Sequence, residues 1–234
     1  MSQCPPRLFP GPQWAVHGND SSLNPTILFR NTLMKLFYAP GACSISPHIA
    51  LCEAGIAHTI EKVDLRAKKT ESGADYLPIN PKGYIPALQL DSGEVLVEGA
   101  TIVQYIADQN PGSGLAPKAG TMERYRLQEW LTFISTELHK GFSPLFNAAM
   151  PDEAKKIFRD RLALRWTYVE KELAGKDYLR GSGFTVADGY LYNMTRWAKR
   201  VEMDLSGHPN VTAFIARVEA RPKVIEALKA EGLM

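Results

Sequence analysis

The chain has 234 residues, of which 45% are apolar and 22% charged, which is typical of a globular protein with one large domain or two small ones. Its formal net charge of +2 and its lack of a basic run interleaved with aromatic residues argue against nucleic acid as a partner. No apolar segment of the sequence approaches the roughly 20 residues of a membrane-spanning helix, so we expect no membrane partner.

The three cysteines, Cys4, Cys43 and Cys52, are too few and too scattered to predict a disulfide framework or a zinc site. None of them has a second cysteine at Cys-x-x-Cys spacing, so a dithiol redox mechanism is not expected either. A few scattered cysteines with no predicted disulfide framework fit a reducing compartment. We therefore expect a cytoplasmic protein without a metal centre.

Residues 1–33 differ in composition from the rest of the chain. They contain five prolines and the polar run Gly18-Asn19-Asp20-Ser21-Ser22, with little periodicity. The charged start and apolar core of a secretory signal are not found there. Two interpretations remain open: a disordered tail, or an extension that begins at a wrongly assigned start codon.

The folded part begins at Met34 with a pattern of strand, helix and strand. The apolar run 34–38 predicts a buried strand, residues 44–54 repeat apolar side chains at helical spacing until Gly55, and the alternation over 58–64 predicts a second strand. Ser44 or Ser46 can cap the helix, and Pro47 suits its first turn. The three elements form a βαβ unit, whose strands are expected to be parallel.

Cys43 lies in the turn between the first strand and the helix. A thiol at the amino end of a helix tends toward the thiolate, because the free N–H groups and the helix dipole stabilise negative charge. The other interpretation is a small buried apolar residue, as many free cysteines are. The position alone does not decide between the two.

The next stretch completes the first domain. Residues 66–75 are polar and predict a loop or a weak helix, and the apolar runs 86–90 and 95–97 flank Asp91-Ser92-Gly93 and predict a hairpin. Pro86 heads the first of these strands, where it needs to donate no hydrogen bond. A helix is predicted from Gly99 to Asp108. The first domain therefore has the order βαβ–ββα over 34–110.

A linker, 111–119, precedes a second domain, 120–234, that is predicted to be helical throughout. Helices are predicted over 120–139, 152–173 and 210–230, the last interrupted by Pro222. Their buried faces are expected to include Tyr125, Trp130, Leu138, Ile157, Leu164 and Trp166. Another helix starts after Phe184, with Thr185 as N-cap and Asp188 closing a capping box.

Five segments in this order resemble the glutathione transferases, and specifically their bacterial beta class. They are Tyr38-Ala-Pro-Gly-Ala-Cys-Ser-Ile-Ser-Pro-His48, Asn80-Pro-Lys-Gly-Tyr-Ile-Pro86, Glu98-Gly-Ala-Thr-Ile-Val-Gln-Tyr105, Glu137-Leu-His-Lys-Gly-Phe-Ser-Pro-Leu-Phe146 and Phe184-Thr-Val-Ala-Asp188. The resemblance spans 34–234. It implies a thioredoxin-like domain that binds glutathione, followed by an all-helical domain, in a homodimer.

The resemblance also implies where glutathione binds. Glu98 and the free N–H groups from Gly99 onward would hold the ammonium and carboxylate of the γ-glutamyl end. Pro86 would be cis and would turn the N–H and C=O of Ile85 toward the cysteinyl backbone of glutathione. The remaining glutathione contacts implied by the resemblance are those of Cys43, Lys68, Thr132, Thr136 and His139.

For catalysis, the resemblance implies that Cys43 faces the glutathione sulfur, with the Ser44 hydroxyl and His139 as hydrogen-bond donors. Stabilised as a thiolate, glutathione would attack a small apolar electrophile, in a pocket for which Phe142 and Trp197 are candidates. Tyr38 and His48 are expected to be structural. Glutathione is a co-substrate here, and no cofactor is expected.

Two alternatives remain beside conjugation. A cysteine close to the sulfur of glutathione can also form mixed disulfides, which would suit thiol exchange or reductive dehalogenation. A ligand-binding protein that has the fold but no turnover is a third possibility, because a fold alone does not establish an activity.

Overall fold

The computed structural model describes residues 33–181 and 183–234, and every structural statement below concerns these residues. Segment 1–32 lies outside the described residues, so neither interpretation of the proline-rich start is tested. Among the helices that are described, none combines the length and the apolar character needed to span a membrane.

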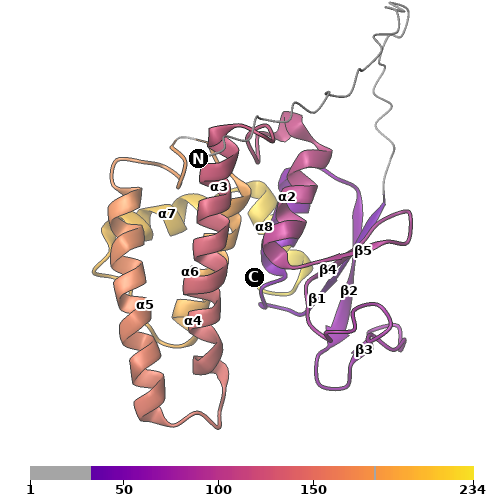
Figure 1. Ribbon diagram of the computed structural model, residues 1–234, viewed down its shortest axis with the longest axis horizontal. Coiled ribbons are helices and arrows are strands. Elements are labelled where there is room, and N and C mark those ends of the chain that lie inside the picture. Colours follow the sequence, from indigo (N-terminus) through magenta and orange to yellow (C-terminus); the bar gives the residue numbers. More distant parts are fainter. Residues whose placement is uncertain (1–32, 182) are drawn as a thin grey trace, which may run out of the picture. The chain divides into compact units, whose positions relative to one another are not determined.

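One sheet of five strands forms the first half of the fold (Figure 1). The strands are β1 (Met34–Tyr38), β2 (His58–Asp64), β3 (Lys69–Thr70), β4 (Ala87–Gln89) and β5 (Val95–Val97), in the spatial order β3-β2-β1-β4-β5. β1 and β2 are parallel, and the other neighbouring pairs are antiparallel. With α1 (Ile45–Glu53) between β1 and β2 and α2 (Gly99–Gln109) after β5, the expected βαβ–ββα order is confirmed.

The short strand β3 corrects the expectation of a loop or weak helix over 66–75. Thr70 pairs with Val63 in an antiparallel register and is buried. A pairing of two residues is too short to produce an alternating pattern, which is why the sequence does not reveal it.

Helices make up the second half. They are α3 (Met122–Phe133), α4 (Lys140–Phe142), α5 (Asp152–Leu173), α6 (Val186–Arg200), α7 (Pro209–Glu219) and α8 (Pro222–Ala230). Short 3₁₀ turns at Pro111–Ser113 and Ser143–Phe146 connect them to their neighbours. Pro222 begins α8, and the 210–230 region is therefore two helices, divided at the proline as expected.

The predicted helix over 120–139 is not a continuous α-helix. It runs as α3 to Phe133 and then as a π-helix, Ile134–His139, before α4. A π-helix inserts a residue into the turn, changes which side chains share a face, and is often found at functional sites. Its last residue is His139. A sequence pattern with 3.6 residues per turn does not reveal this change.

Three side chains that were expected on buried helix faces are exposed: Tyr125 by 55%, Ile157 by 62% and Leu164 by 65%. The prediction is wrong for them because α3 and α5 carry apolar side chains on more than one side. Only one side of each helix packs into the core of this chain, where Trp130 and Trp166 are buried as expected.

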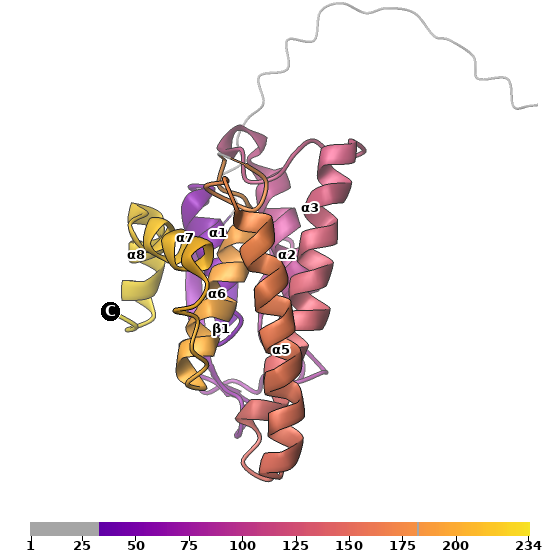
Figure 2. The same ribbon diagram turned by 90° about the vertical axis from the view of Figure 1, so that its left-hand side faces the viewer.

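Helix α1 connects the two halves. Every residue from Ile45 to Cys52 is buried, because α1 packs against α2, α6 and α8. Figure 2 shows α8 and α6 close to α1. A helix buried all round carries no amphipathic stripe, and its position between the sheet and the helices fixes the turn that precedes it.

The capping box at the start of α6 is confirmed. The Asp188 carboxylate accepts hydrogen bonds from the Thr185 N–H at 2.8 Å and the Thr185 hydroxyl at 2.7 Å. Its other oxygen accepts one from the Leu179 N–H at 2.8 Å. The fully buried carboxylate therefore fixes both the helix start and the loop before it.

Candidate active site

A cavity of about 370 Å³ lies where the turn before α1, the loop before β4, the start of α2 and the helices of the second half meet. Residues from both halves of the fold line it, and they include Cys43, Ile85, Pro86, Glu98, Gly99, His139, Tyr190 and Trp197. Six of these are residues that the sequence singled out for glutathione binding or catalysis.

Cys43 lies in the turn before α1 and faces the loop before β4. Its Sγ donates a hydrogen bond to the backbone oxygen of Ile85 at 3.4 Å. Burial raises the pKa of Cys43 to about 12, and the backbone N–H groups of Cys43 and Ser44, which lower the pKa, do not offset burial. Of the two interpretations that the position of Cys43 left open, burial favours the protonated thiol, because desolvation outweighs the helix terminus.

Ser44 does not point toward the Cys43 sulfur. Its hydroxyl is fully buried, donates to the Ala39 carbonyl at 3.2 Å and lies at the same distance from the Ala39 N–H. It makes no side-chain cap to α1. Ser44 therefore closes the turn that presents Cys43, and both the cap and the donor role that the sequence suggested for it are absent.

Internal hydrogen bonds hold the loop before β4 in place. The peptide bond between Ile85 and Pro86 is cis, as the resemblance implies. The backbone oxygen of Tyr84 accepts hydrogen bonds from the Tyr76 hydroxyl at 2.8 Å and the Asn80 amide at 2.7 Å. Buried polar groups therefore hold the peptide next to Ile85, and its orientation does not depend on a ligand.

Glu98 and Gly99 form the opposite wall, at the start of α2. Glu98 has a φ of 70°, unusual for a residue with a side chain. Its carboxylate accepts from Lys82 Nζ at 2.6 Å in an exposed ion pair. A Cβ on Gly99 would lie 3.7 Å from the Pro86 ring, so the helix start and the cis-proline loop are in contact. The amino end of α2 thus opens into the cavity beside a carboxylate.

His139 reaches the cavity from the end of the π-helix. Its Nδ1 lies 2.6 Å from the Tyr190 hydroxyl, and its ring packs edge-on against Trp197 at 4.8 Å between centroids. Burial, and secondarily Lys140, lowers its pKa to about 4. Burial also raises the pKa of Tyr190. Both groups are therefore neutral near pH 7, one as an imidazole and the other as a phenol.

Three predicted glutathione contacts are not at the cavity. Lys68 donates its Nζ to the backbone oxygen of Gly83 at 2.8 Å. Thr132 and Thr136 are exposed and line a separate hollow with Met122 and Tyr125. Of the two pocket candidates, Trp197 lines the cavity, whereas Phe142 is fully buried behind it. Tyr38 and His48 are buried, as expected of structural residues.

The cavity is also lined by three residues for which the sequence predicted no role: Tyr190, Lys140 and Lys82. Tyr190 carried a usable signal, since a tyrosine on the buried face of a helix needs a partner for its hydroxyl. The sequence gave no such signal for Lys82 and Lys140, because a lysine in a loop or on a helix end is usually solvated.

Two family models match the chain. One describes the glutathione S-transferase N-terminal domain and matches residues 42–109. The other describes the glutathione S-transferase C-terminal domain and matches residues 133–222. Together they cover both halves of the fold.

Known proteins agree with these matches. The chain is 46% identical to glutathione S-transferase GstA of Escherichia coli O157:H7 over 200 residues, 86% of this chain and 100% of that protein. It is 36% identical to glutathione S-transferase GST-4.5 of Xanthomonas campestris, over 86% of this chain and all of that protein.

Solved structures extend the comparison. A ternary complex of BphK, a bacterial glutathione transferase, has a TM-score of 0.84 and 55% identity, covering 85% of this chain and 100% of that one. A bacterial beta class enzyme of Sphingomonas chungbukensis has a TM-score of 0.83 and 50% identity, covering 86% and 100%. These identities, together with the two domain models, show that the chain belongs to the glutathione S-transferase family.

Proposed function

We propose that this protein is a beta-class enzyme that conjugates reduced glutathione to small apolar electrophiles. The observation that carries the proposal is the convergence, in one cavity, of Cys43, the cis-Pro86 loop, the Glu98–Gly99 helix start and the neutral His139–Tyr190 pair. A sphingomonad relative, 50% identical to the chain, was solved in complex with glutathione. In this proposal glutathione is the co-substrate, and the reaction needs no cofactor.

In this proposal, backbone hydrogen bonds, a helix start and an ion pair hold glutathione. The backbone of Ile85 pairs with its cysteinyl residue in the manner of an added strand. The carboxylate of its γ-glutamyl end binds at the start of α2, where N–H groups and the helix dipole favour an anion. Glu98 pairs with the ammonium group of glutathione. This group replaces Lys82 Nζ, with which Glu98 forms an ion pair in this structure.

The thiol is activated by neutral donors. If the Tyr190 hydroxyl donates to Nδ1 of His139, the imidazole carries its own proton on Nε2 and can donate it to the glutathione sulfur. The thiol of Cys43, whose raised pKa keeps it protonated, becomes a second donor when it turns from the Ile85 carbonyl, its present acceptor, to the glutathione sulfur. Hydrogen bonds to the charged form lower the pKa of the bound thiol, so more of it is ionised near neutral pH.

The electrophile is proposed to lie against Trp197 and Tyr190, whose aromatic rings line the same cavity. A small apolar or aromatic molecule fits these walls, and 370 Å³ is at the lower end of the range for small-molecule sites. A role in the detoxification of such compounds follows from this pocket chemistry.

The test is the initial rate of conjugation with an activated aryl chloride, for the wild type and for Cys43→Ala and His139→Leu. We expect Cys43→Ala to retain most of the turnover, and His139→Leu to lose tenfold or more, since leucine has no donor for the sulfur. Loss of turnover in Cys43→Ala alone would instead favour thiol exchange through that cysteine. Glutathione binding without turnover in all three proteins would favour the ligand-binding alternative.

The structure favours conjugation over thiol exchange for one reason. An attacking thiol reacts as the thiolate, and the pKa of Cys43 is raised to about 12 by burial. A cysteine that remains protonated can donate a hydrogen bond to the glutathione sulfur, but it is a poor nucleophile toward a disulfide.

We further propose a homodimer formed through α3 and α5. Trp130, Phe133 and Tyr168 stack around a hollow of about 750 Å³ that Leu164 also lines. Tyr168 and Leu164 are 45% and 65% exposed, and adjoining apolar surface of this kind marks protein interfaces. In such a dimer, the exposed Thr132 and Thr136 would contact glutathione in the partner subunit.

Light scattering on purified protein tests the dimer. Tyr168→Glu is expected to lower the mass to that of a monomer, because it places a charge in the hollow. Ile157→Glu, at an exposed position on α5 outside the hollow, is the control and should remain dimeric. Dimers in both variants would refute this interface.

A cytoplasmic location is proposed because Cys43 and Cys52 are both free thiols.

A further inference from the structure

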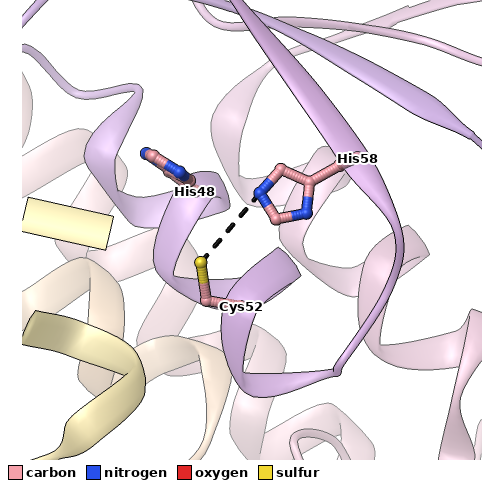
Figure 3. A group of neighbouring side chains, drawn as sticks. All are labelled: His48, Cys52 and His58. Carbon is pink, nitrogen blue, oxygen red and sulfur yellow. Dashed lines mark hydrogen bonds between the residues drawn. The ribbon is translucent and has the colours of Figure 1, made fainter. Parts of the chain in front are cut away.

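A second cluster of chemically reactive side chains lies behind α1, apart from the glutathione cavity. His48 and Cys52 come from consecutive turns of α1, and His58 begins β2 (Figure 3). Each of the three residues contributes one potential ligand atom, and these atoms lie within 4.8 Å of one another. The expected absence of a zinc site rests on the number and spacing of the cysteines, whereas two members of this group are histidines.

Hydrogen bonds fix one nitrogen of each imidazole. Nδ1 of His58 lies 2.7 Å from the backbone oxygen of Ile56. Nδ1 of His48 lies 2.9 Å from a carboxylate oxygen of Glu231, a side chain with no exposed surface. The Ile56 carbonyl can only accept, so Nδ1 of His58 donates to it and Nε2 is the nitrogen that can bind a metal. The Glu231 carboxylate supports Nδ1 of His48 in the same way. A carboxylate or carbonyl behind the imidazole is the usual support of a metal-binding histidine.

Two of the ligand atoms face each other directly. Nε2 of His58 faces Cys52 Sγ at 4.0 Å, and the two imidazole rings are nearly perpendicular with centroids 5.5 Å apart. In a tetrahedral zinc site, sulfur and nitrogen ligands are separated by about 3.5 Å. Closure around the ion therefore requires these atoms to approach by roughly 1 Å, a movement within the reach of small side-chain rotations.

Charge balance favours a divalent cation. Binding of Zn²⁺ replaces the thiol proton, which is released to solvent. The Cys52 thiolate and the Glu231 carboxylate together then offset the two positive charges.

We propose that His48, Cys52 and His58 bind one Zn²⁺ ion, with Glu231 orienting His48 and a water molecule in the fourth position. One thiolate and two imidazoles suit zinc better than the oxygen-seeking cations. His48 and Cys52 are buried, whereas His58 is half-buried and gives the ion a path from solvent. The site joins α1, β2 and the end of α8, so its role is structural.

The test uses the full chain without an affinity tag, stripped of metal by a chelator. Titration with Zn²⁺ against a chromogenic chelator should show one bound equivalent, and Co²⁺ should produce a thiolate-to-metal charge-transfer band. Cys52→Ser should abolish the band and weaken zinc binding at least tenfold. Cys43→Ser and Cys4→Ser remove the other two thiols and should change neither result.

Two further variants test the same site independently, in case Cys52→Ser does not fold. His58→Gln, at a half-buried position, should weaken zinc binding at least tenfold while circular dichroism stays that of the wild type. Glu231→Gln should weaken it by roughly tenfold to a hundredfold, the usual effect of removing a carboxylate behind a ligand. No bound equivalent in the wild type, or a charge-transfer band lost in Cys43→Ser instead of Cys52→Ser, would overturn the proposal.

Discussion

His139 should make the stability of this protein fall as the solution becomes acidic. Its imidazole is largely buried, and burial lowers its pKa from 6.5 to about 4. Below pH 6.5 the unfolded chain therefore takes up a proton on this residue before the folded chain does. Stability contributed by neutral His139 is fully present above pH 6.5 and is lost as the pH falls toward 4.

The size of the effect follows from the two pKa values. At about 1.4 kcal/mol for each unit, the full loss is about 3 kcal/mol, and about 2 kcal/mol of it is lost by pH 5. Asp188 acts in the opposite direction, because burial raises its pKa to about 6 and favours the folded state as it is protonated. The contribution of His139 must therefore be isolated by a variant.

Urea unfolding at pH 7.5 and pH 5, at one fixed protein concentration and without glutathione, measures this contribution. The control is His139→Gln, which does not titrate and whose amide oxygen can still accept from Tyr190. The wild type should lose about 2 kcal/mol more than the variant between these pH values. An equal loss in both proteins would show that His139 is not held neutral by burial, and would remove the basis for its role as a neutral donor.

Three further predictions concern the helices around the site. Gly189→Ala should raise the melting temperature by stabilising α6 by about 1 kcal/mol, because the added Cβ would lie 3.4 Å from Ile49 and 3.6 Å from Phe184; a lower melting temperature would contradict this. Asp188→Ala should lower the unfolding free energy by about 3 kcal/mol, since two buried N–H groups lose their acceptor, and Asp188→Asn should lose less. Trp197→Phe removes the hydrogen bond from the indole to the Gly41 carbonyl at 3.0 Å. It should raise the KM for glutathione, while the unfolding free energy measured by calorimetry falls by only about 1 kcal/mol. An unchanged KM would disprove this positioning role.

Local patterns predicted most of the fold. The strands β1 and β2, the hairpin of β4 and β5, helices α1, α2 and α5, and the start of α6 are within a residue or two of their expected positions. Each has either a regular period or a chemical signal at its boundary, such as the Thr185–Asp188 capping box. The two-residue strand β3 and the π-helix ending at His139 have neither, and both were missed.

The site could be predicted in composition but not in electrostatics. Cys43, Pro86, Glu98 and His139 line one cavity because each belongs to a motif. Whether a helix start lowers the pKa of a thiol depends on how deeply the thiol is buried, and burial is a property of the whole fold. The orientation of the Ser44 hydroxyl toward Ala39 is equally invisible in a sequence.

The turn that carries Cys43 belongs to the first domain, yet much of its support comes from the second. Gly41 accepts from the Trp197 indole through its carbonyl, and its N–H donates to Glu231 at 3.3 Å. The Ala42 carbonyl accepts from the Asn193 amide at 3.4 Å. The same Glu231 carboxylate binds His48 on α1. Because α6 and the C-terminal end hold this turn, the first domain contains the glutathione-binding motifs but depends on the helices to orient them.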